Sequence, residues 1–215
     1  MSPIGIFGGT FDPIHFGHLR TAFELLLALR LAEVRLVPAG NPPHRGAPLC
    51  DAQYRLAMVR AAIADQPGLV VDDREIRRGG PSYTVLTLRE LRAEAPRRPI
   101  CLLVGMDAFL GLPQWHEWRS VLDLAHVVVA HRPGWTAPGS GTLGELLAVR
   151  ATQRVEDLHE TVAGRIHVRP VTQLEISSTD LRELIVAGRD PRYLLPDSVR
   201  ALIHDTGCYL PGATR

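Results

Sequence analysis

The stretch that decides the fold is GGTFDPIHFGH, residues 8–18, which follows the apolar run Ile4 to Phe7. A short apolar run that ends in two glycines is typical of a buried strand. Beyond the stretch, apolar residues recur at helical spacing from Leu19 to about Leu31, which predicts a helix. A glycine-rich turn between a strand and a helix aims backbone N–H groups and the positive end of the helix dipole at one point, where an anion can bind.

The rest of the chain continues to alternate between strands and helices. Strands are expected at 34–37, 69–71, 100–104, 127–130, 166–168 and 171–176, and helices at 52–64, 81–95, within 143–162, at 178–187 and at 196–204. This alternation predicts an α/β fold, with a doubly wound, mostly parallel sheet and a small helical C-terminal part. We expect one domain over residues 1–215, with 177–215 as its C-terminal helical subregion. Residues 135–142, rich in Gly, Pro, Ser and Thr, are expected to form a mobile loop.

Composition excludes several classes of function. The net charge is +1, which argues against a nucleic-acid surface and a polybasic membrane anchor. All 24 residues counted as Lys+Arg are arginines, so chemistry that depends on a phosphate-loop lysine or a Schiff-base lysine is excluded. Any cationic side chain that binds phosphate must then be an arginine. The N-terminus does not resemble a signal peptide, and no apolar run has the length of a membrane span. The three widely spaced cysteines favour reduced thiols and a cytoplasmic location.

Two histidines end the decisive stretch. His15 and His18 are three residues apart and flank Gly17 at the start of the expected helix. If that turn is helical, both imidazoles project toward one side. Two hydrogen-bond donors placed together in this way suit a triphosphate whose charge develops during displacement.

A second candidate phosphate site lies near the other end of the chain. Ser177, Ser178 and Thr179 precede an amphipathic helix that carries Arg182 one turn inside it. These hydroxyl residues form either a plain helix N-cap or a cradle for the β- and γ-phosphates, in which Arg182 supplies the positive charge. The two interpretations are compatible, because one helix start can do both.

Trp115 lies in GLPQWHEW, residues 111–118, which predicts a proline-set turn rather than a strand. A tryptophan in such a turn either packs at the base of the loop or stacks on a pyridine ring. Asp107, which follows the strand expected at 100–104, is likewise either a helix cap or a ribose-binding acid.

The stretch from Gly8 to His18 resembles the ATP signature of the HxGH nucleotidylyltransferases. More closely, the chain resembles the bacterial nicotinate-nucleotide adenylyltransferases over nearly all of its length. The ordered motifs that carry this resemblance are PPHR at 42–45, PSYT at 81–84, GMD at 105–107, PQW at 113–115, RP at 132–133 and ISSTDLR at 176–182. The resemblance implies a Rossmann-like nucleotidylyltransferase fold and transfer of an adenylyl group from ATP to nicotinate mononucleotide in NAD biosynthesis.

The resemblance also implies roles for individual residues. Catalysis is expected from His15 and His18. The residues expected to bind ATP are Gly8, Gly9, Thr10, Phe11, Gly105, Asp107, Ile176, Ser177, Ser178, Thr179 and Arg182. Those expected to bind nicotinate mononucleotide are His44, Arg45, Tyr83, Thr84, Trp115, His116 and Arg132. In this family a lysine is frequent at the place of Arg45, so arginine there keeps the charge.

The expected chemistry needs no general base, because the attacking phosphate monoester is already ionised at neutral pH. Mg²⁺ is the expected cofactor, held mainly by the ATP phosphates and water rather than by a protein metal site. ATP and nicotinate mononucleotide are the expected partners, without nucleic acid or membrane, and the sequence leaves monomer or homo-oligomer open. Two alternatives remain: preference for nicotinamide mononucleotide, and a nucleotide-binding regulatory module without catalysis. Transfer to phosphopantetheine is disfavoured, because the family with that activity is shorter and lacks the Tyr83-Thr84 and Trp115 set. A fragment of a class I aminoacyl-tRNA synthetase is disfavoured, because the chain lacks a lysine-rich second signature.

Overall fold

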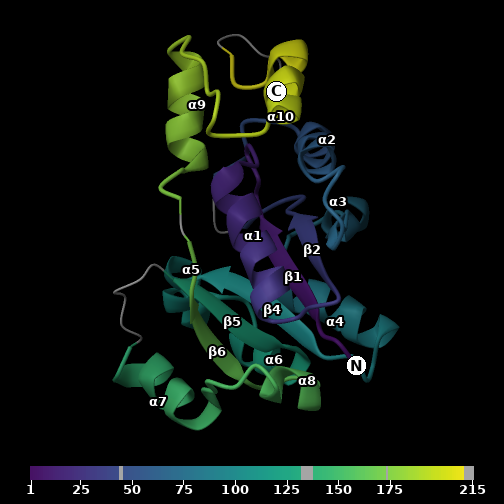
Figure 1. Cartoon of the computed structure of the whole chain (residues 1–215), viewed down its shortest axis with the longest axis vertical. Helices are drawn as coiled ribbons and strands as arrows, with labels where there is room; N and C mark the ends of the chain where they lie inside the picture. The colour runs from purple at the N-terminus through teal and green to yellow at the C-terminus, as the bar shows by residue number, and fades with distance from the viewer. Residues whose placement is uncertain (44–45, 132–137, 173, 211–215) are drawn as a thin grey trace.

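The computed structural model describes residues 1–43, 46–131, 138–172 and 174–210. Its centre is a six-stranded sheet in the order β3-β2-β1-β4-β5-β6 (Figure 1), and every neighbouring pair is parallel. The strands are β1 (Ile4–Gly9), β2 (Glu33–Pro38), β3 (Leu69–Val71), β4 (Ile100–Gly105), β5 (His126–His131) and β6 (Ile166–Pro170). This order is that of doubly wound folds, so the predicted α/β class is confirmed.

Helices cover both faces of the sheet. Successive side chains of each buried strand point to opposite faces, so each strand contributes to the core on both sides. Leu102 and Leu103 are neighbours in β4, yet they belong to two different buried clusters. The helices are α1 (Phe16–Ala28), α2 (Ala52–Ala62), α3 (Arg74–Arg78), α4 (Thr84–Glu94), α5 (Met106–Leu110), α6 (Trp118–Leu124), α7 (Gly141–Arg150), α8 (Asp157–Glu160), α9 (Ser178–Val186), α10 (Asp197–Thr206) and the 3₁₀ turn η1 (Leu112–Gln114). The apolar faces of α1, α2, α9 and α10 join one cluster, and those of α4 and α6 join the other.

The strand order reverses between β1 and β4, and the pairing of these two strands is short. It runs only from Ile4 opposite Ile100 to Ile6 opposite Leu102. Beyond that point β1 continues beside β2, and β4 continues beside β5 as far as Gly105. The carboxyl half of β1 is therefore separated from the carboxyl half of β4. Ligands of open α/β sheets bind at such a switch point.

Two expectations about secondary structure need correction. The described residues of 171–176 form no strand, because the segment leaves the sheet toward α9 after a last bond from the Val171 N–H to the carbonyl of His131. Its apolar residues Val171 and Ile176 pack on the cluster beside α1 instead. The expected loop at 135–142 lies partly outside the described residues, and its last two residues already belong to α7.

The expectation that the cysteines are reduced thiols is also wrong for two of the three. Cys50, just before α2, and Cys208, just after α10, form a disulfide with their Cα atoms 5.7 Å apart. Cys101 is buried in β4 and free. The disulfide pair is 158 residues apart in sequence and meets because α10 packs beside α2, where the Ser198 hydroxyl donates to the Ala61 carbonyl. In the described ranges no helix has both the length and the apolar character needed to cross a membrane.

Candidate active site

Glycines lie on both sides of the switch point. A Cβ atom added to Gly8 of β1 or to Gly105 of β4 would meet no atom within 4 Å, so open space borders both strands there. Gly9 differs, because its Cβ would lie 2.9 Å from the ring of Phe11. Phe11 is buried and has a left-handed backbone with φ of 48°, which turns the chain back over Gly9.

His15 and His18 stand at the start of α1, as the sequence predicts. His15 is the N-cap residue, and its carbonyl accepts from the N–H groups of His18 at 3.0 Å and Leu19 at 3.1 Å. The two imidazole rings stack with centroids 3.7 Å apart and planes 27° apart. Gly17 is required between them, because a Cβ there would lie 3.0 Å from two His15 ring atoms and 3.5 Å from the Ile176 carbonyl oxygen.

The surroundings of His15 keep its ring neutral. The side chain is 4% exposed, and burial lowers the pKa of His15 to about 4. Within the described part of the chain, its Nδ1 atom has no hydrogen-bond partner. The Phe11 ring stands edge-on to His18 with centroids 5.1 Å apart, which makes one wall of this pair apolar. A buried, neutral imidazole can donate one N–H without bringing a second positive charge.

The start of α9 is joined directly to the decisive stretch. Ser177 caps the helix, since its hydroxyl accepts from the Asp180 N–H at 3.1 Å. The Ser178 hydroxyl donates to the Pro13 carbonyl at 3.0 Å, and the Arg182 guanidinium donates to the Asp12 carbonyl at 2.8 Å. The cap interpretation is therefore confirmed for Ser177. The same helix start also lies against the loop that carries the histidines, so the two helix N-termini meet.

Residues expected to form the acceptor site also come together. Tyr83 is the N-cap residue of α4, and its ring stacks on that of His116 with centroids 4.3 Å apart. Thr84 is the first residue of α4, so its N–H has no acceptor within the helix. Trp115 follows η1, as the expected turn requires, and packs at the edge of the cluster beneath β4.

Comparison with known proteins now places the chain. A family model described as Cytidylyltransferase-like matches residues 6–184. A relative from Aeromonas hydrophila subsp. hydrophila, named probable nicotinate-nucleotide adenylyltransferase, is 54% identical over 209 residues, which is 97% of this chain and 98% of the relative. A relative of the same name from Halorhodospira halophila is 48% identical over 210 residues, covering 96% of this chain and 94% of its own.

The chain belongs to the nicotinate-nucleotide adenylyltransferase family.

The solved structure of Plasmodium falciparum nicotinic acid mononucleotide adenylyltransferase complexed with NaAD shares the fold. Its TM-score is 0.73 at 16% identity, covering 97% of this chain and 98% of the other. The expected resemblance and the Rossmann-like fold are both confirmed.

Some residues that the family resemblance singles out lie outside the described residues: His44, Arg45 and Arg132. Asp107 is described. It is exposed in the first turn of α5, two residues after Gly105, which is the N-cap. The helix-cap alternative for Asp107 is therefore wrong. The Asp107 carboxylate does not cap α5, and the residue lies just after β4, at the switch point.

Three residues that support the candidate site are absent from the sequence-based list. Asp12 is 5% exposed, and its carboxylate accepts from the Leu49 N–H at 2.9 Å and the Tyr209 hydroxyl at 2.8 Å. Arg55, also buried, donates to the Thr10 carbonyl at 2.6 Å and to the Cys50 carbonyl at 3.0 Å. Burial together with Asp12 raises the pKa of Tyr209 far above its ordinary value, so the phenol stays a donor. These contacts fix the position of residues 10–12 in the residue 8–18 loop.

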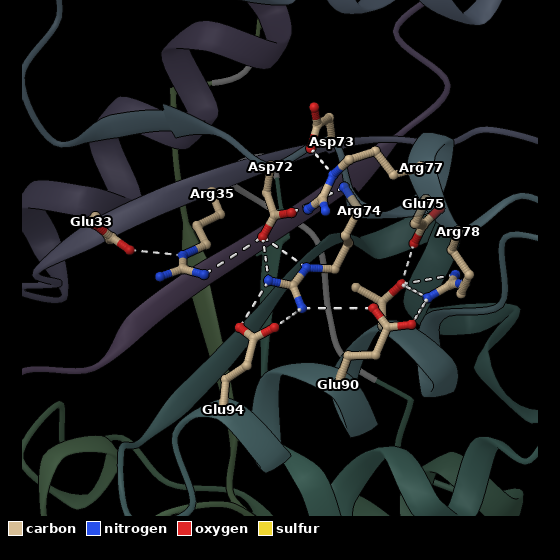
Figure 2. Close-up of polar contacts among 11 residues, drawn as sticks. Glu33, Arg35, Asp72, Asp73, Arg74, Glu75, Arg77, Arg78, Glu90 and Glu94 are labelled. Carbon is tan, nitrogen blue, oxygen red and sulfur yellow. Dashed lines mark hydrogen bonds and ion pairs between the residues drawn. The ribbon is translucent and has the colours of Figure 1, made fainter.

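A second gathering of charges lies at the β3 edge of the sheet (Figure 2), and its side chains neutralise one another. Arg74 is 7% exposed and donates to Asp72 at 2.8 Å and to both oxygens of Glu94 at 3.1 Å. Arg35 pairs with Glu33 at 2.8 Å. We assign these pairs to holding β2, α3 and α4 together, because their charges are already matched.

Proposed function

We propose that this chain transfers the adenylyl group of ATP to nicotinate mononucleotide, producing nicotinate adenine dinucleotide and pyrophosphate in NAD biosynthesis. One observation carries the proposal: the starts of α1 and α9 meet through the Ser178–Pro13 and Arg182–Asp12 bonds. Gly8, in the strand that leads into the same loop, borders open space. Two helix N-termini at one point suit a triphosphate. We infer the acceptor, nicotinate mononucleotide, from the names of the relatives.

In the proposed reaction an oxygen of the acceptor phosphate attacks the α-phosphorus of ATP. A new P–O bond forms, the bond to the bridging oxygen breaks, and pyrophosphate leaves with the electron pair. The attacking oxygen is ionised at neutral pH, so the chain supplies alignment and charge stabilisation rather than a base. His18 donates to the α-phosphate oxygens, and the neutral His15 donates toward the bridging region.

The β- and γ-phosphates would lie at the start of α9. The residues that would bind them are Ser177, Ser178, Thr179 and Arg182, with the Ile176 backbone beside them. Arg182 lies within 4.0 Å of the Asp12 carboxylate, which orients its guanidinium while leaving further donors for phosphate. The loop from Gly8 to Phe11 would follow the adenosine side of ATP, where Gly105 and Asp107 would meet the ribose.

Magnesium enters this proposal with the nucleotide. The described residues contain no group of three His, Cys, Asp or Glu side chains placed to hold a metal, and the cradle offers N–H groups and a guanidinium, which bind anions. Such donors would bind the phosphates of ATP, and the phosphates together with water would hold the Mg²⁺ ion. Bound there, Mg²⁺ would neutralise charge on the β- and γ-phosphates.

The acceptor would lie against the Tyr83–His116 stack. We propose that Trp115 stacks on the nicotinate ring and that the N–H groups of Thr84 and His116 bind its carboxylate. Backbone donors favour a carboxylate over an amide, whose NH₂ would face another donor. Arg132 would bind the mononucleotide phosphate, and His44 and Arg45 are further proposed contacts of the mononucleotide. A cytoplasmic location without nucleic-acid or membrane partners belongs to the same proposal.

The test is the variant His18→Ala, with His204→Ala as the control because His204 is exposed on α10. We expect kcat to fall at least about a hundredfold while the Kd for ATP changes little. The control should match the wild type. Pyrophosphate release from ATP, Mg²⁺ and nicotinate mononucleotide measures turnover, and the same assay with nicotinamide mononucleotide measures acid preference. Unchanged turnover in His18→Ala would refute the catalytic assignment, and ATP binding without turnover in the wild type would favour a regulatory module.

A further inference from the structure

Glu75 is a buried carboxylate that the proposed reaction does not use. It lies on α3 and is 7% exposed. Its carboxylate accepts from the Thr87 hydroxyl at 2.6 Å, and the Ser82 hydroxyl lies close enough to favour its charged form. Thr87 lies in the first turns of α4, and Ser82 stands directly before Tyr83, so both hydroxyls belong to the start of α4. Figure 2 shows Glu75 beside Arg78, whose guanidinium reaches Glu90.

Both hydroxyl oxygens already accept a hydrogen bond, which leaves each proton able to point toward Glu75. The Ser82 oxygen accepts from the Asn41 N–H at 3.1 Å, and the Thr87 oxygen accepts from the Arg78 guanidinium at 3.3 Å and 3.4 Å. A hydroxyl carries one proton, and Thr87 donates its proton to the acid. A carboxylate can accept from both hydroxyls. Burial raises the pKa of Glu75, and the bonds from Thr87 and Ser82 with the nearby Arg78 charge oppose that rise.

The same contacts bring in the loop after β2. The Ser82 N–H donates to the Asn41 carbonyl at 2.8 Å, so the two residues bond in both directions. Gly40 lies against the backbone of α3, where a Cβ would come within 2.7 Å of the Glu75 carbonyl oxygen. Glu75 thus joins three segments: its own helix, the loop after β2 and the first turn of α4.

We infer that Glu75 is a positioning residue for the acceptor mononucleotide, acting through the Ser82 and Thr87 hydroxyls on the first turn of α4. That turn carries the Tyr83 ring, which stacks on His116, and the Thr84 N–H. A displaced turn would move the Thr84 N–H directly and would move His116 through the Tyr83 ring. The N–H groups of these two residues are the ones proposed to bind the nicotinate carboxylate. The ATP side would stay in place, because it is built from the residue 8–18 loop and α9. The inference rests on the proposed function for the identity of the acceptor.

The experiment replaces Glu75 by glutamine, which keeps the shape but turns one acceptor into a donor. One of the two hydroxyls then faces an N–H group. We expect the KM for nicotinate mononucleotide to rise roughly tenfold, with the KM for ATP changed less than about twofold. The matched control is Glu94→Gln, at the last residue of α4 and bonded to Arg74 instead, and it should keep both KM values.

Ser82→Ala gives a second, independent route to the same contact. It removes one of the two donors, so it should raise the same KM by a smaller factor. The double variant should be little worse than Glu75→Gln alone, because both changes act on one hydrogen-bonded network. Should Glu75→Gln fail to fold, Ser82→Ala decides the question by itself.

Two results would overturn the inference in a wild type that turns over nicotinate mononucleotide. One is an unchanged acceptor KM in folded Glu75→Gln and Ser82→Ala. The other is a fall in active protein with both KM values unaltered, which would show a role in stability alone. A wild type that binds ATP without turning over nicotinate mononucleotide would reject the proposed function, and this inference with it, so the two failures are distinguishable.

Discussion

The imidazole rings of His15 and His18 lie stacked at the start of α1 with their centroids 3.7 Å apart. Two positive charges at this separation would repel each other strongly. Burial prevents that arrangement, because it lowers the pKa of His15 to about 4. The pair therefore offers two ring N–H donors at neutral pH without two adjacent charges, which suits the proposed stabilisation of negative charge on the α-phosphate.

The same burial predicts an acid-sensitive stability. The pKa of His15 is about 4 in the folded chain and 6.5 when unperturbed, so the unfolded chain binds more protons between these values. The free energy of unfolding should fall as the pH drops from about 6.5 toward 4, by on the order of 3 kcal/mol from His15. Urea unfolding of the wild type and His15→Gln across this range measures the difference. His126 and His167 also have lowered pKa values, so only the difference between the two proteins reports His15, and parallel curves would contradict the prediction.

Gly8→Ala should separate nucleotide binding from folding. The added Cβ would enter open space, so the thermal midpoint should stay within about 2 °C of the wild type. The methyl group would stand between the backbone and the nucleotide, and we expect the Kd for ATP to rise at least about tenfold. Gly139→Ala is the matched control, because its Cβ also meets no atom within 4 Å. Equal ATP affinity in the two variants would show that the nucleotide does not bind against β1 at Gly8.

Tyr209→Phe tests the support behind the decisive stretch. The variant removes the 2.8 Å hydrogen bond to the buried Asp12 carboxylate and should cost about 1–3 kcal/mol of unfolding free energy. We also expect a lower kcat, since Asp12 precedes the turn that ends at His15. Tyr193→Phe is the control, because Tyr193 is 84% exposed. Urea unfolding and pyrophosphate release check the two effects, and a Tyr209→Phe protein as stable as the control would refute the support.

The disulfide between Cys50 and Cys208 predicts a thiol count. Protein unfolded without reductant should show one reactive thiol, that of Cys101, and protein unfolded with reductant should show three. Reduction should lower the free energy of unfolding by about 2–4 kcal/mol. In Cys208→Ser the reductant should have no further effect on stability. Three thiols in the absence of reductant would refute the pairing.

Much of the fold could be predicted because its signals are local. Apolar runs such as Ile100 to Val104 and the helical spacing after His18 are visible within a few residues, and the strand-helix alternation implies the parallel sheet. Shorter helices were missed: α3 and α5 have five residues each, too few to show a helical period. The strand expected at 171–176 failed because apolar residues there pack beside α1, and periodicity alone does not distinguish this from a sheet.

The candidate site was predictable where its chemistry lies in one motif. His15, His18 and Ser177 to Arg182 stand out in sequence, and the structure brings the two groups together. Their supports could not be predicted. Tyr209 meets Asp12 across 197 positions, and Glu75 meets Thr87 from a neighbouring helix. A lone tyrosine or glutamate gives no sign of its partner until the chain is folded.

The bond from Ser178 to Pro13 joins residues 165 positions apart, and this has a consequence for synthesis of the chain. A nascent polypeptide that has emerged only as far as β6 contains both signature histidines and most of the sheet. It still lacks α9, and therefore half of the phosphate cradle. Nucleotide turnover should therefore begin only after α9 has emerged and folded against the residue 8–18 loop, so shorter nascent chains would not consume ATP.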